Sequence, residues 1–259
     1  DPMNDFSISF EYNMQNNTEN DILQLPEKIA IEKEIQIVIC IDEFQQISDF
    51  EDSKTFQKKL RSVWQLQQHV SYCLFGSKKH LMNELFEKKN LPFYKFGDAI
   101  YLTKIETKYW IEYICKRFEN TGKHISPELA EEICRLVDNH SSYVQQLSWL
   151  LWIRTINTAT TEQLSYALED LLDQNNILFQ SETENLSAYQ MNFLKAIVDG
   201  IHTKFSSKEV ISKYNLGTSA NIVRLKNALL QKELIETNGK EIVLADPVFE
   251  VWFKKEMLY

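Results

Sequence analysis

The first hundred residues alternate between short apolar runs and stretches with helical periodicity. The runs predict strands at 35–41, 70–75 and 99–102, and the periodic stretches predict helices at 27–34, 54–69 and 79–86. Pro26 suits the first turn of the earliest helix. Strands separated by helices indicate an α/β fold with a parallel sheet. The unbroken run at 35–41 also predicts a strand that is buried on both faces.

Before these elements, residues 6–12 alternate apolar and polar side chains as an edge strand does. After Thr103 the strand pattern stops, and helices are expected at 106–119, 127–138, 142–157 and 161–179.

A different module is predicted from Ser187 onward. Its order is helix 187–199, helix 206–213, a turn at Leu216-Gly217, helix 218–231, and strands at 233–237 and 241–244. The two strands flank Asn238-Gly239, a strong hairpin signal. Helix, helix, turn, helix and hairpin is the order of a winged helix. The predicted organisation is therefore a core at 1–104, a helical region at 105–184 and a winged helix at 185–259.

The charge is distributed unevenly over a chain with a net charge of −9. Residues 1–184 hold 18 Lys and Arg against 29 Asp and Glu, a balance of −11, whereas residues 185–259 hold 10 against 8, a balance of +2. The total argues against a protein that coats nucleic acid. No apolar run approaches the roughly 20 residues that a bilayer requires, so no membrane span is expected.

The four cysteines show no metal-binding spacing and lie in apolar stretches. Buried, reduced thiols of a cytoplasmic protein are therefore expected at Cys40, Cys73, Cys115 and Cys134. The five histidines are scattered, which gives little support for a histidine-based metal site.

Two acidic residues end the first apolar strand, in the form of a Walker B motif. Ligands of open α/β sheets bind at the carboxyl ends of the strands. Asp42 is expected to hold Mg²⁺ through its water shell, and Glu43 to orient the water that attacks a γ-phosphate. The alternative is an apolar strand that runs into a solvated acidic turn.

The chain resembles the archaeal-type P-loop ATPases of the STAND/AAA+ group, in which an ATPase core and a helical lid precede a winged helix. The similar segments occur in the family's order at 25–30, 38–47, 75–77, 92–98, 139–147, 216–221 and 246–253. The resemblance implies ATP and Mg²⁺ as cofactors. It also implies an incomplete parallel P-loop sheet followed by the lid and the winged helix.

The resemblance assigns further residues to a nucleotide. Ser77 would be a catalytic sensor near the γ-phosphate, although it also suits the N-cap of the following helix. Lys95 would offer a cation to phosphate, or it is a solvated charge. His140 and Tyr143 would sense nucleotide from the lid, or Tyr143 simply packs in the core of its helix.

No G-x-x-x-x-G-K-[ST] stretch occurs in the 259 residues. Family order places this loop upstream of Asp1, and the start of the chain has neither an initiator methionine nor a signal peptide. The chain is therefore expected to be a truncated form of a longer ATPase, with a naturally inactive ATPase as the alternative; the intact Asp42, Glu43 and Ser77 favour the truncated form. Without the backbone donors and lysine of the loop, it is expected to be inactive alone.

The expected function is ATP hydrolysis that drives a conformational switch. The alternative is a DNA-binding or protein-docking winged helix attached to a non-catalytic ATPase-like half. The candidate recognition helix offers polar groups to DNA at Thr218, Ser219, Asn221, Arg224, Lys226 and Asn227. Its apolar residues favour a helix that packs into its own core: Ile222, Val223, Leu225, Leu229 and Leu230.

Overall fold

The computed structural model describes residues 19–257, so the edge strand predicted at 6–12 lies outside the described residues. The chain forms two compact units, and the boundary between them falls between Tyr101 and Leu102. This boundary lies near the predicted end of the core at 104. The division of the second unit at 184 stays a prediction.

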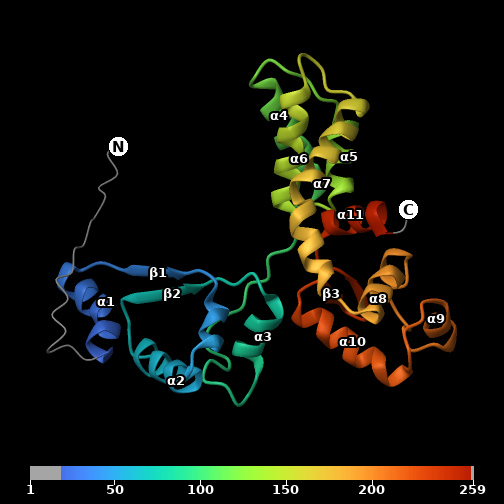
Figure 1. Cartoon of the computed structure of the whole chain (residues 1–259). Helices are drawn as coiled ribbons and strands as arrows, with labels where there is room; N and C mark the ends of the chain where they lie inside the picture. The colour runs from blue at the N-terminus through green and yellow to red at the C-terminus, as the bar shows by residue number, and fades with distance from the viewer. Residues whose placement is uncertain (1–18, 258–259) are drawn as a thin grey trace. The chain divides into compact units, whose positions relative to one another are not determined.

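The first unit is built on a parallel pair of strands. Strand β1 (Ile37–Ile41) pairs with β2 (Val70–Leu74) in the register Ile37 to Val70 through Ile41 to Leu74 (Figure 1). The connection between them contains the 3₁₀ helix η1 (Phe44–Asp49) and α2 (Ser53–Trp64). Helix α1 (Glu19–Lys33) precedes β1, and α3 (Lys79–Glu87) follows β2. The parallel α/β arrangement predicted from the sequence is confirmed.

Backbone hydrogen bonds extend the strand pairing beyond the strand ends. The N–H of Phe75 donates to the carbonyl of Ile41, and the N–H of Phe44 donates to the carbonyl of Phe75, both at 2.8 Å. These two bonds align the segment after β1 with the segment after β2, where the candidate catalytic residues lie.

A hydrophobic cluster of aromatic and aliphatic side chains, called the aromatic core below, fills the interior of this unit. Its buried members are Phe44, Ile47, Leu60, Val63, Trp64, Leu85 and Phe93. The Trp64 ring stacks on Tyr72 of β2 with ring centroids 4.0 Å apart. The Arg61 guanidinium donates to the carbonyls of Pro92 and Tyr94, which fixes the loop after α3 against α2.

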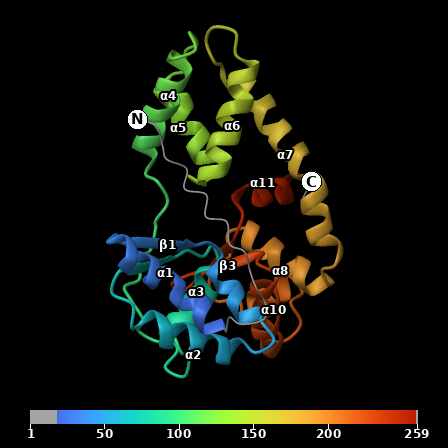
Figure 2. The same ribbon diagram turned by 90° about the vertical axis from the view of Figure 1, so that its left-hand side faces the viewer.

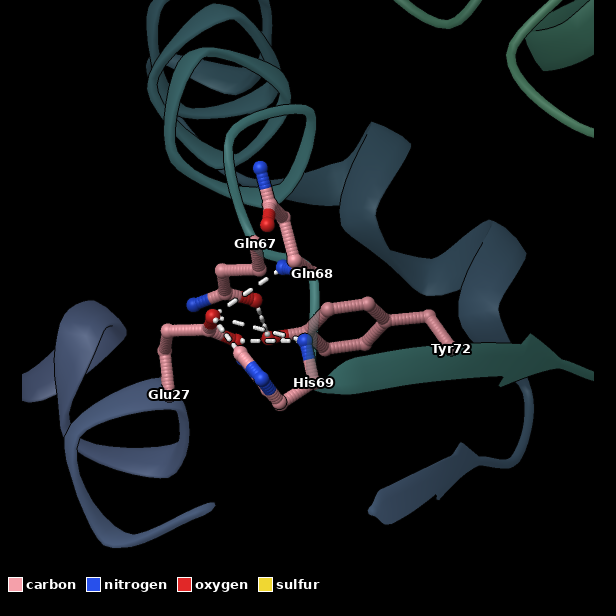
Figure 3. Close-up of polar contacts among 5 residues, drawn as sticks. All are labelled: Glu27, Gln67, Gln68, His69 and Tyr72. Atoms are coloured by element: carbon pink, nitrogen blue, oxygen red, sulfur yellow. Dashed lines mark hydrogen bonds and ion pairs between the residues drawn. The ribbon is translucent and has the colours of Figure 1, made fainter. Parts of the chain in front are cut away.

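A polar network fastens α1 to the beginning of β2 (Figure 3). The Glu27 carboxylate accepts the backbone N–H groups of Gln68 and His69, at 3.0 and 3.1 Å, and lies 2.9 Å from Nδ1 of His69. Tyr72 donates its hydroxyl to Gln67 at 2.8 Å. The hydrogen bond from His69 is the main reason that the pKa of Glu27 lies below its ordinary value. This network lies at the amino end of β2, away from the candidate site.

In the first unit, two predicted helix boundaries differ clearly from the structure. Helix α1 begins at Glu19, so Pro26 lies inside it and not at its first turn. The helix predicted to reach residue 69 ends at Trp64. The N–H groups of Gln68 and His69 donate to Glu27 instead of continuing the helix.

The expectation that β1 is buried on both faces is also wrong. Its residues alternate, and Val38 is 65 % exposed. Cys40 and its register partner Cys73 are exposed on the same face of the sheet, so these two are not the buried thiols that were expected. Cys134 is buried and Cys115 is half-buried. The apolar pattern predicted the strand correctly, but it did not predict that one face of the strand is exposed.

The strand predicted at 99–102 does not form. Ile100 and Leu102 are 86 % and 91 % exposed, and the residues form no ladder with another strand in the described part of the chain. An apolar run becomes a strand only when a neighbour accepts its N–H groups and donates to its carbonyls.

The second unit opens with a helical bundle. Helices α4 (Thr107–Glu119), α5 (Pro127–Leu136), α6 (Ser141–Arg154) and α7 (Thr161–Glu184) pack side by side (Figure 1, Figure 2). All four were expected from the periodicity, with α6 shorter and α7 longer than predicted. Thr160 caps α7 in a capping box with Gln163.

The predicted winged-helix order follows. Its elements are α8 (Ala188–Val198), α9 (Lys208–Lys213), α10 (Ser219–Gln231), β3 (Ile235–Asn238) and β4 (Glu241–Leu244). Strands β3 and β4 are antiparallel and Asn238 opposes Glu241, so the hairpin forms as expected. Its two-residue turn is Gly239-Lys240, one residue later than Asn238-Gly239, and Gly239 has a φ of 63°.

A last helix, α11 (Pro247–Met257), was not predicted. The Asp246 carboxylate caps it by accepting the N–H groups of Val248 and Phe249, at 2.7 and 3.0 Å. Phe249 and Trp252 of α11 pack against Phe179 of α7. The Asp-Pro pair at 246–247 is the sequence signal that could have indicated this helix.

One continuous hydrophobic core joins the bundle to the winged helix. It extends from Trp110 and Ile114 in α4, through Leu171 and Phe179 in α7, to Phe253 in α11. The helical bundle and the winged helix are therefore packed as one body within the second unit. Across residues 19–257 no helix combines the length and apolarity that a membrane crossing requires.

Candidate functional site

The carboxyl ends of β1 and β2 bring together two of the predicted site residues. The Ser77 hydroxyl donates to Oε2 of Glu43 at 3.0 Å, although the residues are 34 positions apart. Gln45 donates its side-chain amide to the same oxygen at 2.5 Å. Glu43 lies between β1 and η1 with φ 50° and ψ 38°, in the left-handed region that non-glycine residues seldom occupy. Such backbone conformations are concentrated at functional sites.

The donors around Glu43 favour its ionised form. The Ser77 hydrogen bond is the largest influence that lowers the pKa of Glu43 below its ordinary value, and the Gln45 amide and the charge of Lys78 act in the same direction. Partial desolvation opposes them. The side-chain donors Ser77 and Gln45 both bond Oε2, which leaves Oε1 as the oxygen better able to accept a proton or orient a water molecule. The contribution of Gln45 and Lys78 to this site was not predicted from the sequence.

Asp42 stands beside this group with an exposed side chain. Its Oδ1 accepts the N–H of Glu43 at 2.8 Å, and no residue of the described chain donates to Oδ2. No three His, Cys, Asp or Glu side chains gather as a metal site anywhere within 19–257. A single exposed carboxylate suits Mg²⁺, which keeps several waters and is bound through one or two carboxylates and substrate phosphates. The site therefore fits Mg²⁺ held with a nucleotide, and it does not fit a metal held by protein side chains alone.

Lys95 belongs to the same unit but not to this cluster. Its ammonium lies 5.6 Å from the centre of the neighbouring Tyr94 ring, and its backbone N–H donates to the Phe86 carbonyl at 3.0 Å. Within the described residues no hydrogen bond or ion pair joins Lys95 to Asp42, Glu43 or Ser77. The side chain is exposed, which agrees with the solvated charge considered as its alternative.

His140 and Tyr143 lie in the second unit and contact each other, with ring centroids 4.7 Å apart. Tyr143 is buried, and its hydroxyl donates to Oδ2 of Asp246 at 2.5 Å. Burial and this carboxylate raise the pKa of Tyr143 well above its ordinary value. The contacts of Tyr143 are those of a packing residue that joins α6 to the cap of α11. His140 remains exposed at the start of α6.

The candidate DNA-binding residues on α10 differ in their exposure. Ser219 and Arg224 are exposed, and Lys226 is half-buried. Asn221 donates its amide to the Leu216 carbonyl at 3.1 Å, so it holds the turn that precedes the helix. The apolar residues of α10 divide as well: Ile222, Leu225 and Leu229 are buried, whereas Val223 is 63 % exposed and is not part of the core.

Comparison with known proteins agrees with this architecture. Residues 177–255 match the family model of a probable winged helix domain. The Walker-type ATPase of Pyrococcus abyssi is similar over 95 % of this chain and 72 % of its own, with a TM-score of 0.71 and 16 % identity. No curated protein matches the sequence.

Two further solved structures are more distant. The ORC2 protein of Aeropyrum pernix is 13 % identical, with a TM-score of 0.48 over 96 % of this chain and 73 % of that one. The ORC1 protein of Aeropyrum pernix is 11 % identical, with a TM-score of 0.45 over 93 % and 70 %. The likeness to the Pyrococcus protein establishes the fold alone: an α/β fold of the P-loop ATPase kind with a C-terminal winged helix.

Proposed function

We propose that the protein is an ATP-hydrolysing P-loop ATPase of the AAA+/STAND type that works as a nucleotide-dependent conformational switch. The observation that supports this proposal is the meeting of Glu43 and Ser77 beside Asp42, at the carboxyl edge of the parallel sheet. In open α/β sheets this edge is where ligands bind.

Each of the three residues has a proposed role. Asp42 holds the water shell of Mg²⁺, which would neutralise charge on the triphosphate. Glu43 orients the attacking water through Oε1, because Oε2 already accepts two donors. Ser77 fixes the carboxylate and places a hydroxyl near the γ-phosphate. The free cysteines of the described chain favour a reducing compartment, and the cytoplasm is the proposed location.

The phosphates themselves need a cradle that these residues do not supply. A P-loop binds phosphate through backbone N–H groups and a lysine, and no such sequence occurs in the 259 residues. The isolated chain is therefore expected not to bind ATP tightly. Calorimetric titration of this chain with Mg²⁺-ATP tests the point, and a micromolar affinity would contradict it.

The function is tested in the full-length protein by the metal dependence of ATP binding. Asp42→Asn is expected to weaken ATP binding in the presence of Mg²⁺ and to leave the weaker binding in EDTA unchanged. Asp49→Asn is the matched control, because Asp49 is an exposed acid at the end of η1. Equal Mg²⁺-dependent affinities for wild type and Asp42→Asn would remove Asp42 from the site.

The shared core of the second unit supports the switch. Because the lid and the winged helix pack as one body, a nucleotide-linked movement of the lid would carry the winged helix with it. His140 is the exposed residue of the lid pair and is the better candidate for contact with nucleotide. Tyr143 would link it to α11 through Asp246. Lys95 stays a proposed phosphate contact for a state in which its loop approaches the nucleotide.

A second candidate function is docking of DNA or protein by the winged helix. The outward side of α10 presents Ser219, Val223 and Arg224, with Arg224 as its exposed cation. One exposed cation beside an exposed valine favours a protein surface over a phosphate backbone, because DNA affinity grows with each phosphate that is neutralised. Lys226 is half-buried and Asn221 is bonded to Leu216, so both are weaker DNA contacts than the sequence suggested.

A further inference from the structure

Gln45 is a buried polar residue in an apolar cluster. It is 2 % exposed and lies between Phe44 and Ile47 on η1, both of which belong to the aromatic core of the first unit. Its amide nitrogen donates to Oε2 of Glu43 at 2.5 Å. Its carbonyl oxygen, Oε1, is buried and has no donor in the described chain.

The unmet oxygen indicates that Gln45 is not placed for stability. A buried acceptor without a donor destabilises the folded state, and an apolar side chain of similar length would avoid that loss. The contact that Gln45 does make is with the carboxylate proposed to orient water. Gln57 is also 2 % exposed with an unmet Oε1, but it donates to Ser53 and not to a site residue. The two glutamines therefore differ in the group that accepts their amide hydrogen bond: a proposed catalytic carboxylate for Gln45 and a serine hydroxyl for Gln57.

Gly76 makes the space that Gln45 occupies. A Cβ at position 76 would lie 2.4 Å from Oε1 of Gln45 and 2.4 Å from Cγ of Met82. Gly76 is not among the residues with positive φ, so a side chain here would conflict with Gln45 and Met82 and not with the backbone conformation. Any larger residue would displace the Gln45 amide or Met82. Gly76 also directly precedes Ser77, the second donor to Glu43.

We propose that Gln45 positions the Glu43 carboxylate for hydrolysis, and that Gly76 is needed to seat the Gln45 amide. Gln45 and Ser77 both donate to Oε2, so the two hydrogen bonds fix the orientation of the carboxylate and leave Oε1 for the water molecule. The role of Gln45 in hydrolysis rests on the proposed function, whereas its contact with Glu43 does not. Gln45 is a positioning residue, since it acts on the reaction through Glu43.

The kinetic test uses the full-length protein and Gln45→Met, which keeps the length of the side chain and removes its donor. The kcat for ATP hydrolysis is expected to fall about 10- to 100-fold, the range expected when a reacting group is misplaced, while the KM for ATP changes less than about twofold. The melting temperature is expected to be unchanged or higher, because the unmet oxygen is gone. Gln57→Met is the control and is expected to keep the wild-type kcat.

Two results would overturn the proposal. One is a wild-type kcat in a folded Gln45→Met protein. The other is an equal loss of kcat in Gln45→Met and Gln57→Met, which would indicate a general packing effect.

A second readout needs no hydrolysis. In the 259-residue chain, the ¹H–¹⁵N signals of the Gln45 side-chain amide are expected to exchange slowly with solvent. Glu43→Ala and Gly76→Ala should each shift these signals and speed their exchange, whereas Glu51→Ala should not. Signals that do not respond to Glu43→Ala would overturn the contact. If the full-length wild type did not hydrolyse ATP, the proposed function would fail. The NMR measurement would still test the hydrogen bond between Gln45 and Glu43.

Discussion

Tyr143 donates its hydroxyl to the Asp246 carboxylate across 103 positions of sequence, at 2.5 Å. Asp246 accepts two backbone N–H groups at the start of α11 as well. One carboxylate thus caps the last helix and holds the first turn of α6. This relationship fastens the winged helix to the helical bundle, and it explains why Tyr143, expected from the resemblance to sense nucleotide, is buried.

Removing the hydroxyl of Tyr143 should weaken the second unit. Tyr143→Phe is expected to lower its free energy of unfolding by about 1.5–3 kcal/mol, because a buried hydrogen bond to a charged group is lost. Urea denaturation of residues 102–259, which form one compact unit, measures this. Tyr166→Phe is the control: its exposed hydroxyl contacts Glu162 at 3.3 Å, and its effect should stay below about 0.5 kcal/mol. Equal effects of the two changes would contradict the role of Asp246.

The same bond predicts how stability depends on alkaline pH. The pKa of Tyr143 is raised in the folded protein, mainly by burial and then by Asp246. In the unfolded chain a tyrosine loses its proton near pH 10. Above that pH the unfolded state binds fewer protons than the folded state, so stability falls as pH rises.

Tyr143→Phe should therefore show a shallower loss of stability above about pH 10 than the wild type does. Urea midpoints measured in steps from pH 8 to pH 11.5 test this difference. Parallel curves for the two proteins would show that Tyr143 titrates normally in the folded state.

Binding of DNA by the winged helix is best tested on residues 102–259, since Phe179 and Asn176 of α7 contact Trp252 of α11. With one exposed cation on α10, binding to a mixed-sequence duplex should be weak. Any binding should fall with salt, and Arg224→Ala should reduce the salt slope by about one unit. Lys116→Ala, an exposed change on α4, is the control. Tight binding that is unaffected by Arg224→Ala would place the DNA contact elsewhere.

The sequence could predict those parts of the structure that depend on local pattern. Asn238-Gly239 marked the hairpin, and the two apolar runs predicted the parallel strands that end next to Glu43 and Ser77, although the contact between these two side chains was not itself predicted. Parallel strands in register bring their carboxyl ends together, so the two residues lie at one edge of the sheet.

Contacts between distant segments could not be predicted in this way. Nothing near Tyr143 indicates that its partner is Asp246, and nothing in the strand pattern shows that Val38 and Cys40 face outward. The amide of Asn221 has the chemistry of a DNA contact, but it donates to the Leu216 carbonyl instead. The apolar run at 99–102 had the composition of a strand but pairs with no other strand among residues 19–257. In each case the outcome depended on which distant segment lies beside the residue.

The most direct test of the account is single-turnover ATP hydrolysis by the full-length protein with Glu43→Gln. The amide keeps the shape of the side chain but is a far weaker acceptor for the proton of an attacking water, so hydrolysis should fall by about 10²- to 10⁴-fold while ATP stays bound. Glu51 is an exposed acid in the same connection between β1 and β2, and the control protein with Glu51→Gln should hydrolyse ATP at the wild-type rate. Hydrolysis by Glu43→Gln at the wild-type rate would contradict the assignment of this edge of the sheet as the active site.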